Sequence, residues 1–230
     1  EVFYLWDGVA KVSGLGEVSY NEVVDFESGA KGIALNLEEH FVWVVVLSGF
    51  NTIKEGEKVY SSGKILEVPV GRGLIGRVVD ALGYPIDWLG EVKSTENYPI
   101  ERVATWVMSR KSVHEPMSTG IKAIDALVPI GRGQRELIIG DRQTGKTQIA
   151  IDAILNQKGQ WVTCVYVAIG QKEGKIARIV EELKKRGAMD YTIVVAAWAS
   201  APASMQYLAP YAGCAMAEYS MFNKEHSLII

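Results

Sequence analysis

An eight-residue motif near the middle of the chain has the residue types of a phosphate-binding loop. It matches the pattern GxxxxGK[ST] and consists of Gly140, Asp141, Arg142, Gln143, Thr144, Gly145, Lys146 and Thr147. Its glycines let the backbone curl so that successive N–H groups point at phosphate oxygens. Lys146 would contact the β- and γ-phosphates, and the Thr147 hydroxyl would bind Mg²⁺. The motif therefore predicts a site for a nucleoside triphosphate with Mg²⁺, with ATP (or ADP) as the expected nucleotide.

Such a loop works only between a strand and a helix. The short apolar segment Glu136–Ile139 is the expected strand, and Gln148–Asn156 is the expected helix, which ends before Gly159. A helix that begins near Lys146 would add the positive end of its dipole to the phosphate site. We therefore expect the segment 136–156 to form a strand, loop and helix.

The end of the next strand is where a water-activating residue is expected. The buried strand Val162–Ile169 is followed by Gly170-Gln171-Lys172-Glu173. Gln171 can donate or accept a hydrogen bond with water, but it cannot take a proton from it. Glu173 could take a proton, but its position two residues later places it on the expected surface. The site is thus predicted to hold nucleotide, with Gln171 beside it, rather than to hydrolyse it.

The second half of the chain alternates strands with helices, which is typical of a parallel sheet covered on both faces. The remaining expected elements are the helix Lys175–Arg186, the strand Thr192–Ala197, the helix Ala203–Phe222, interrupted near Pro210, and the strand Ser227–Ile230. The first 70 residues instead contain short strand-like segments separated by Gly, Asn and Ser, which favours a small antiparallel barrel or sandwich. These segments are Val9–Val12, Glu22–Phe26, Lys31–Leu37, Val42–Leu47, Lys58–Tyr60 and Lys64–Val68.

Two domains are therefore expected, at residues 1–70 and 71–230, the second opening with the Gly- and Pro-rich segment 71–135. The charge supports this division. The formal net charge is -3, yet the first 70 residues carry five Lys and no Arg against two Asp and nine Glu, a net charge of -6. This balance predicts no general affinity for nucleic acid or for an anionic membrane. No apolar segment approaches the ~20 residues that span a bilayer, so direct membrane insertion is not expected.

Several further features favour structural roles. Gly71–Gly76 fits GxGxxG, but Pro69 breaks the preceding strand and a strand-like segment follows, so we interpret it as a turn rather than a dinucleotide site. His114 is expected to be a hydrogen-bonded loop histidine. Cys164 and Cys214 lie in apolar sequence without a metal-ligand pattern, so both are expected to be buried, reduced thiols.

Four sequence blocks closely resemble the α subunits of F-type ATP synthases, and the similarity extends from Asp7 to Ile230. The blocks are residues 111–116 (KSVHEP), 129–136 (PIGRGQRE), 166–172 (YVAIGQK) and 208–213 (LAPYAG). The resemblance implies a crown β-barrel followed by a RecA-like P-loop domain that is incomplete at its C-terminal end. It also implies nucleotide contacts at Arg142, Gln143, Gly145, Lys146 and Thr147, and at Gln148, where relatives have a smaller residue.

The same resemblance implies a regulatory, ATP-binding subunit without catalysis of its own, because catalytic β subunits carry Glu where this chain has Gln171. Its implied partners are β subunits alternating with α in a hexameric ring, a central γ subunit and a peripheral stalk. The implied activity of the assembly is proton-translocating ATP synthesis and hydrolysis. Its implied location is peripheral, on a bacterial plasma membrane, mitochondrial inner membrane or thylakoid, facing the cytoplasm, matrix or stroma. An acidic pair that helps hold Mg²⁺, and a distant arginine finger, are expected beyond Ile230.

Two alternatives stay open at this point. One is a self-sufficient ring ATPase of the same superfamily, such as a secretion motor or RNA translocase. The acidic first domain argues against RNA, and Gln171 argues against an independent motor. The other is a fragment whose loop is not formed on its own. The chain also departs from the family where Trp replaces Gly or another small or polar residue, and a Trp that requires positive φ would be strained. These positions are Trp6, Trp43, Trp88, Trp106, Trp161 and Trp198.

Overall fold

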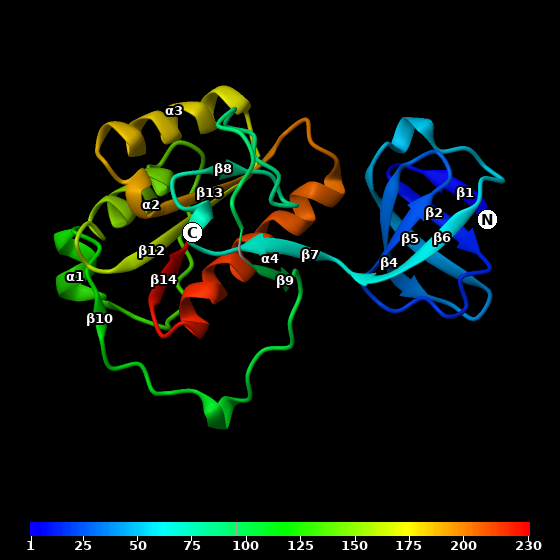
Figure 1. Cartoon of the computed structure of the whole chain (residues 1–230). Helices are drawn as coiled ribbons and strands as arrows, with labels where there is room; N and C mark the ends of the chain where they lie inside the picture. Colours follow the sequence, from blue (N-terminus) through cyan, green and yellow to red (C-terminus); the bar gives the residue numbers. More distant parts are fainter. Residues whose placement is uncertain (95) are drawn as a thin grey trace.

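The N-terminal part of the chain is an antiparallel β-structure. The computed structural model describes residues 1–94 and 96–230 (Figure 1). Six strands pair in the order β1-β2-β5-β4-β3-β6. The Val2 N–H donates to the Glu57 carbonyl at 2.8 Å, which joins the two ends of the sheet. The bounds are β1 Val2–Trp6, β2 Val9–Ser13, β3 Glu22–Phe26, β4 Lys31–Leu37, β5 Phe41–Ser48 and β6 Val59–Ile65. The predicted small antiparallel barrel is confirmed.

Strands β1 and β6 differ from the sequence prediction. The sequence prediction did not include strand β1. Only Val2 of this strand is buried, while Phe3 and Tyr4 are exposed, so no alternation of apolar and polar residues marks it. The expected gap at Ser61–Gly63 lies inside β6. There Ser61 Oγ and the Gly63 N–H both donate to the buried Glu22 carboxylate, which keeps this polar segment in the sheet. The expected strand that began at Lys64 is instead β7 Glu67–Val70, which pairs with β9 Glu96–Pro99 outside the barrel.

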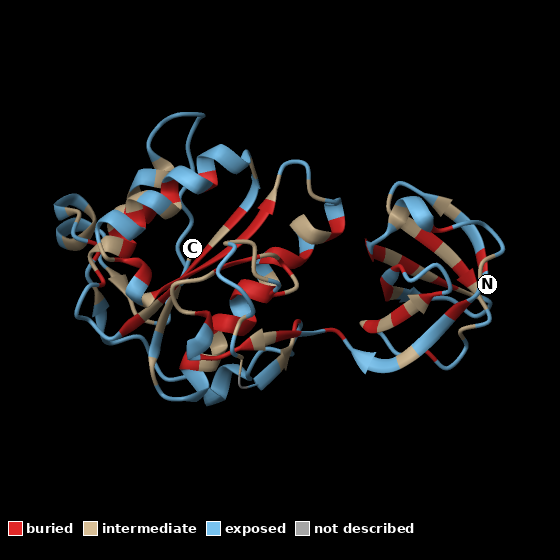
Figure 2. Cartoon of the chain, turned by 45° about the horizontal axis from the view of Figure 1, so that its top comes forward, coloured by how far each residue is buried: buried red, intermediate tan, exposed pale blue. Residues whose placement is uncertain are grey.

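The second part is built on the predicted parallel sheet, with strand order β14-β12-β13-β8. Strand β12 pairs in parallel with both β13 and β14, and β13 pairs in parallel with β8. The bounds are β8 Val78–Val79, β12 Val162–Gln171, β13 Thr192–Trp198 and β14 His226–Ile229. The sheet confirms the expected α/β architecture, and its strands form the buried centre in Figure 2.

Alternate residues of the central strands face two hydrophobic cores. On one face, Val165 and Val195 pack with the helix α4 Ala203–Phe222. On the other, Cys164 and Val194 pack with α2 Lys146–Leu155 and α3 Glu173–Lys185. The period-2 alternation of the strands thus places helices on both faces. Short elements complete this part: α1 Lys122–Leu127, β10 Pro116–Met117 and β11 Ile130–Gly131.

Helix α4 corrects two expectations. It runs unbroken through Pro210, although proline inside a helix costs about 3 kcal/mol. Burial of Leu208, Ala209 and Ala212 against the sheet offsets that cost. Cys214 lies on the exposed side of this helix, so the expectation that both thiols are buried holds only for Cys164. An apolar sequence context alone does not tell which side of a helix a residue occupies.

The backbone conformation shows that the glycine-rich segment is a turn and that two tryptophans have positive φ angles. Residues Arg72–Leu74 form a 3₁₀ turn followed by strand β8, so the GxGxxG segment is a turn, as expected. A Cβ on Gly73 would lie 2.0 Å from the Lys93 carbonyl oxygen. Trp88 and Trp161 have φ angles of 60° and 55°, which confirms the expected strain at these two positions.

Candidate functional site

The predicted phosphate-binding loop curls through two left-handed residues. Gln143 has a φ of 62°, and Gly145, the N-cap of α2, has a φ of 89°. A Cβ on Gly145 would meet no atom within 4 Å, so the space over the helix N-terminus is open. Helix α2 spans ten residues. Its first N–H groups and the positive end of its dipole favour an anion at this position.

The Lys146 side chain closes the loop on itself. Its ammonium donates to the carbonyl oxygens of Gly140 and Asp141. The Thr144 hydroxyl donates to the Asp141 carbonyl at 2.9 Å. Lys146 and Thr147 are half-buried, whereas residues 140–145 are exposed. The ammonium is thus held inside the loop, where a phosphate can replace the carbonyl oxygens as its partner.

Thr147 is the residue of the loop that the sequence predicts to bind Mg²⁺. Its hydroxyl lies in the first turn of α2, a hard oxygen ligand of the kind that Mg²⁺ takes. Across the described ranges 1–94 and 96–230, no group of three or more His, Cys, Asp or Glu side chains could hold a metal. The Gln148 amide donates to Asp152 Oδ1 at 2.9 Å, so this side chain lies along the helix.

The predicted strand Glu136–Ile139 before the loop is wrong for this structure. The segment is irregular, and Leu137 and Ile139 are 80% and 82% exposed. It faces β14 across a cavity of about 720 Å³ lined by Ile138 from one side and by His226 and Leu228 from the other. Within the described residues, β14 pairs only with β12. An apolar segment becomes a strand only when it reaches a partner edge, and here the cavity separates the two.

Gln171 is the last residue of β12, because the strand extends two residues beyond its predicted end at Ile169. Its amide donates to the Tyr166 hydroxyl at 3.4 Å, and its Oε1 is buried without a hydrogen-bond partner among the described residues. No hydrogen bond in the described part of the chain connects Gln171 with the loop 140–147. Glu173 begins α3 and is exposed, as expected. The structure therefore confirms the local positions of loop and glutamine, but it does not join them through direct contacts.

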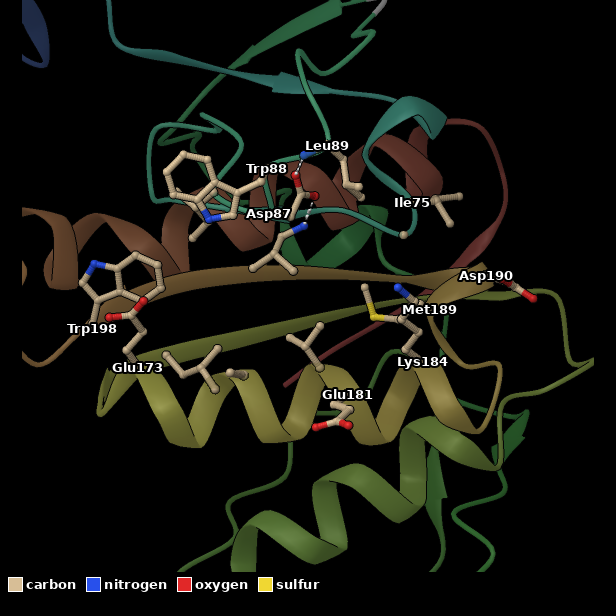
Figure 3. Close-up of a pocket in the computed structure, with 16 residues that line it drawn as sticks. Ile75, Asp87, Trp88, Leu89, Glu173, Glu181, Lys184, Met189, Asp190 and Trp198 are labelled. Carbon is tan, nitrogen blue, oxygen red and sulfur yellow. Dashed lines mark hydrogen bonds between the residues drawn. The ribbon is translucent and has the colours of Figure 1, made fainter.

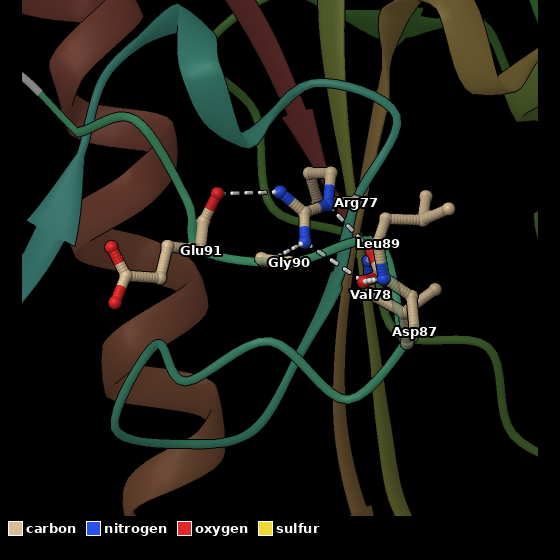
Figure 4. A network of polar contacts seen from close by, with 6 residues as sticks. All are labelled: Arg77, Val78, Asp87, Leu89, Gly90 and Glu91. Atoms are coloured by element: carbon tan, nitrogen blue, oxygen red, sulfur yellow. Dashed lines mark hydrogen bonds and ion pairs between the residues drawn. The ribbon is translucent and has the colours of Figure 1, made fainter.

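One buried ion pair was not visible in the sequence. Arg77 Nε lies 2.7 Å from Asp87 Oδ2, and the two side chains are 13% and 8% exposed (Figure 4). The Asp87 carboxylate also accepts the N–H groups of Val78 at 3.0 Å and Leu89 at 3.1 Å. Burial alone would raise the pKa of Asp87, but these hydrogen bonds and the guanidinium outweigh it and lower the pKa to about 2. The pair fastens the loop that follows β8 to the edge of the sheet.

His114 shows the expected loop role. Its Nδ1 lies 3.0 Å from the Ser112 carbonyl, and its side chain is exposed.

No helix among the described residues is both long and apolar enough to cross a membrane.

Both structural parts match domains of one protein family. Residues 1–63 match the beta-barrel domain of the ATP synthase alpha/beta family, and residues 120–230 match the nucleotide-binding domain of the same family. The chain is 58% identical over 229 residues to the ATP synthase subunit alpha of Streptococcus mutans serotype c (strain ATCC 700610 / UA159). That similarity covers 100% of this chain and 46% of the relative. The chain thus spans about half the length of the curated relative it matches.

Proposed function

The chain belongs to the ATP synthase alpha/beta family, and from this premise we propose that it acts as the nucleotide-holding α subunit of a rotary, proton-translocating ATP synthase. In this role it binds Mg-ATP or Mg-ADP without turning it over, and it supports synthesis and hydrolysis at a neighbouring catalytic subunit. The observation that carries the proposal is the pairing of a complete GxxxxGK[ST] loop with a glutamine at the end of β12. A glutamine can orient a water molecule but cannot deprotonate it.

The proposed contacts follow the loop. The N–H groups of residues 140–147 cradle the phosphates, Lys146 neutralises the β- and γ-phosphates, and Thr147 binds Mg²⁺. The ion, when bound, supplies charge neutralisation between the phosphates. Gln171 completes the polar surroundings, and Gln148 contributes through its position in the first turn of α2. Arg142, Gln143 and Thr144 shape the loop around the nucleotide.

The assembly belongs to the same proposal. The barrel of residues 1–70 forms part of a crown, and the nucleotide-binding domain of residues 71–230 contributes to a ring of alternating α and β subunits. The ring surrounds a central γ subunit and is held by a peripheral stalk on the surface of an energy-transducing membrane. The acidic first 70 residues support a protein partner over a nucleic acid, because phosphate backbones require a basic surface.

A thermal-shift titration tests nucleotide binding. Saturating Mg-ATP at about 100 times its Kd should stabilise the chain by about 2.7 kcal/mol, and Lys146→Ala should abolish that stabilisation. Lys184→Ala is the matched control, because this exposed lysine lies on α3 outside the loop. If Mg-ATP leaves the melting temperature of the wild-type chain unchanged, this chain does not form the site on its own.

A hydrolysis assay tests the absence of turnover. The purified chain should release phosphate from Mg-ATP no faster than the Lys146→Ala variant does. Steady hydrolysis that Lys146→Ala abolishes would contradict the holding role and favour a self-sufficient ring ATPase. Stimulation of that hydrolysis by RNA would identify the alternative as an RNA translocase.

A further inference from the structure

A second cavity lies on the opposite side of α3 from the loop's helix, and the nucleotide site does not use it. Its volume is about 810 Å³, and it is bounded by α3, the end of β13 and the loop that follows β8 (Figure 3). Its apolar lining includes Ile75, Val78, Ile86, Ile176, Val180 and Met189. None of the residues 140–148, nor Gln171, lines it. A ligand of this cavity would therefore contact residues other than those proposed for the nucleotide.

The rim of the cavity is acidic. Glu173, Glu181 and Asp190 line it together with one cation, Lys184. In the described part of the chain none of these three carboxylates forms an ion pair, whereas the fourth, Asp87, is neutralised by Arg77. Carboxylates around an apolar depression concentrate a negative potential there. The cavity therefore disfavours anions and favours a cation that brings apolar surface with it.

Two indole rings, those of Trp88 and Trp198, line this cavity together with the Glu173 carboxylate (Figure 3). Trp198 ends β13, and Trp88 is 98% exposed with a left-handed φ of 60°. The Asp87 carboxylate accepts the N–H of Leu89, which follows Trp88, and the N–H of Val78 in β8, so the turn that carries Trp88 is tied to the sheet beside the cavity. Backbone strain that the surroundings enforce is a recurrent feature of binding sites. Two indoles with a carboxylate form a surface that attracts ammonium groups through cation–π and ionic interactions.

We propose that this cavity binds an organic cation with an apolar body. The ammonium head lies between Trp88, Trp198 and Glu173. The body extends over the aliphatic floor formed by Ile176, Val180 and Met189. A neutral molecule of the same shape lacks the ionic attraction, and an anion is repelled by the rim.

Isothermal titration of the full chain with three matched probes tests this. Hexyltrimethylammonium should bind at least about tenfold more tightly than 1-hexanol, and hexanoate should not bind measurably. Glu173→Gln should weaken hexyltrimethylammonium binding several-fold. Glu182→Gln, on the same helix but outside the cavity lining, should leave the affinity unchanged. Equal binding of the cation and hexanoate would overturn the proposal.

Trp88→Gly separates binding from folding. Glycine relieves the left-handed strain, so this variant should melt at a higher temperature and yet bind hexyltrimethylammonium several-fold more weakly. Unchanged affinity in both Trp88→Gly and Glu173→Gln would refute the proposed head-group site. Because both side chains are exposed, neither change threatens the fold, and circular dichroism verifies this.

Discussion

Asp87→Asn should destabilise the second part of the chain by about 2.5 kcal/mol at pH 7. The Asp87 pKa is lowered from its ordinary value of 3.8 to about 2. A tenfold change in proton affinity is worth about 1.4 kcal/mol, so the charged carboxylate stabilises the folded state by about that 2.5 kcal/mol. Asparagine keeps the shape but removes the charge opposite Arg77, whose side chain is only 13% exposed. Arg77 retains hydrogen bonds to the Gly90 carbonyl at 2.6 Å and the Glu91 carbonyl at 3.3 Å, which limits the loss.

The stabilisation by the Asp87 carboxylate depends on pH. The folded-state pKa lies below the unfolded one, so the stabilisation is complete well above pH 3.8 and is lost as the pH falls toward 2. The difference between wild type and Asp87→Asn in urea unfolding, followed by circular dichroism, should therefore shrink between about pH 5 and pH 2.

Asp25→Asn is the matched control. Its carboxylate lies 3.9 Å from Lys31 Nζ, and the two side chains are 47% and 59% exposed, so the change should be within about 0.5 kcal/mol. An Asp87→Asn effect that is equally small, or that stays constant down to pH 2, would refute the assignment of a buried, charge-dependent anchor.

Three further outcomes follow from the geometry. Trp161→Gly should raise the free energy of unfolding by about 0.5 to 1 kcal/mol, because Trp161 has a φ of 55° and is 92% exposed; Trp106→Gly, at a φ of -57°, should bring no such gain in the same urea titration. Gly73→Ala should lower the free energy of unfolding by about 1 to 3 kcal/mol, because the new Cβ would lie 2.0 Å from the Lys93 carbonyl oxygen. Gly16→Ala places its Cβ in open space, so a comparable loss there would contradict the steric argument. A thiol reagent at pH 8 should label exposed Cys214 but not Cys164, whose burial raises its pKa to about 12; labelling of both thiols before unfolding would show that the sheet opens readily.

Features that depend on neighbouring residues in the chain were accessible from the sequence. The loop motif, the helix that follows it, and the continuous apolar segments of β12 and β13 are local properties of composition and spacing. Gln171 was placed within two residues of its strand end for the same reason. Side-chain type alone then limited its chemistry, because an amide cannot act as a base.

Features that depend on distant partners required the tertiary structure. The apolar segment 136–139 has the composition of a strand, but it lies apart from β14, and backbone groups form a ladder only when an edge is in reach. Pro210 predicted an interruption that burial of α4 overrides. The Arg77–Asp87 pair joins residues ten positions apart, and the acidic cavity beside α3 joins segments as distant as Ile75 and Trp198; no local pattern marks either feature.

The loop and its glutamine were therefore determined by the sequence itself, since each is a matter of which groups a short segment carries. The tertiary structure decided what surrounds them. It determined which strand edge stays open, how Lys146 folds onto the Gly140 and Asp141 carbonyls, and which exposed tryptophan is held at the mouth of a second cavity. These properties arise from packing between elements, where the free energy depends on groups that the chain brings together only when it folds.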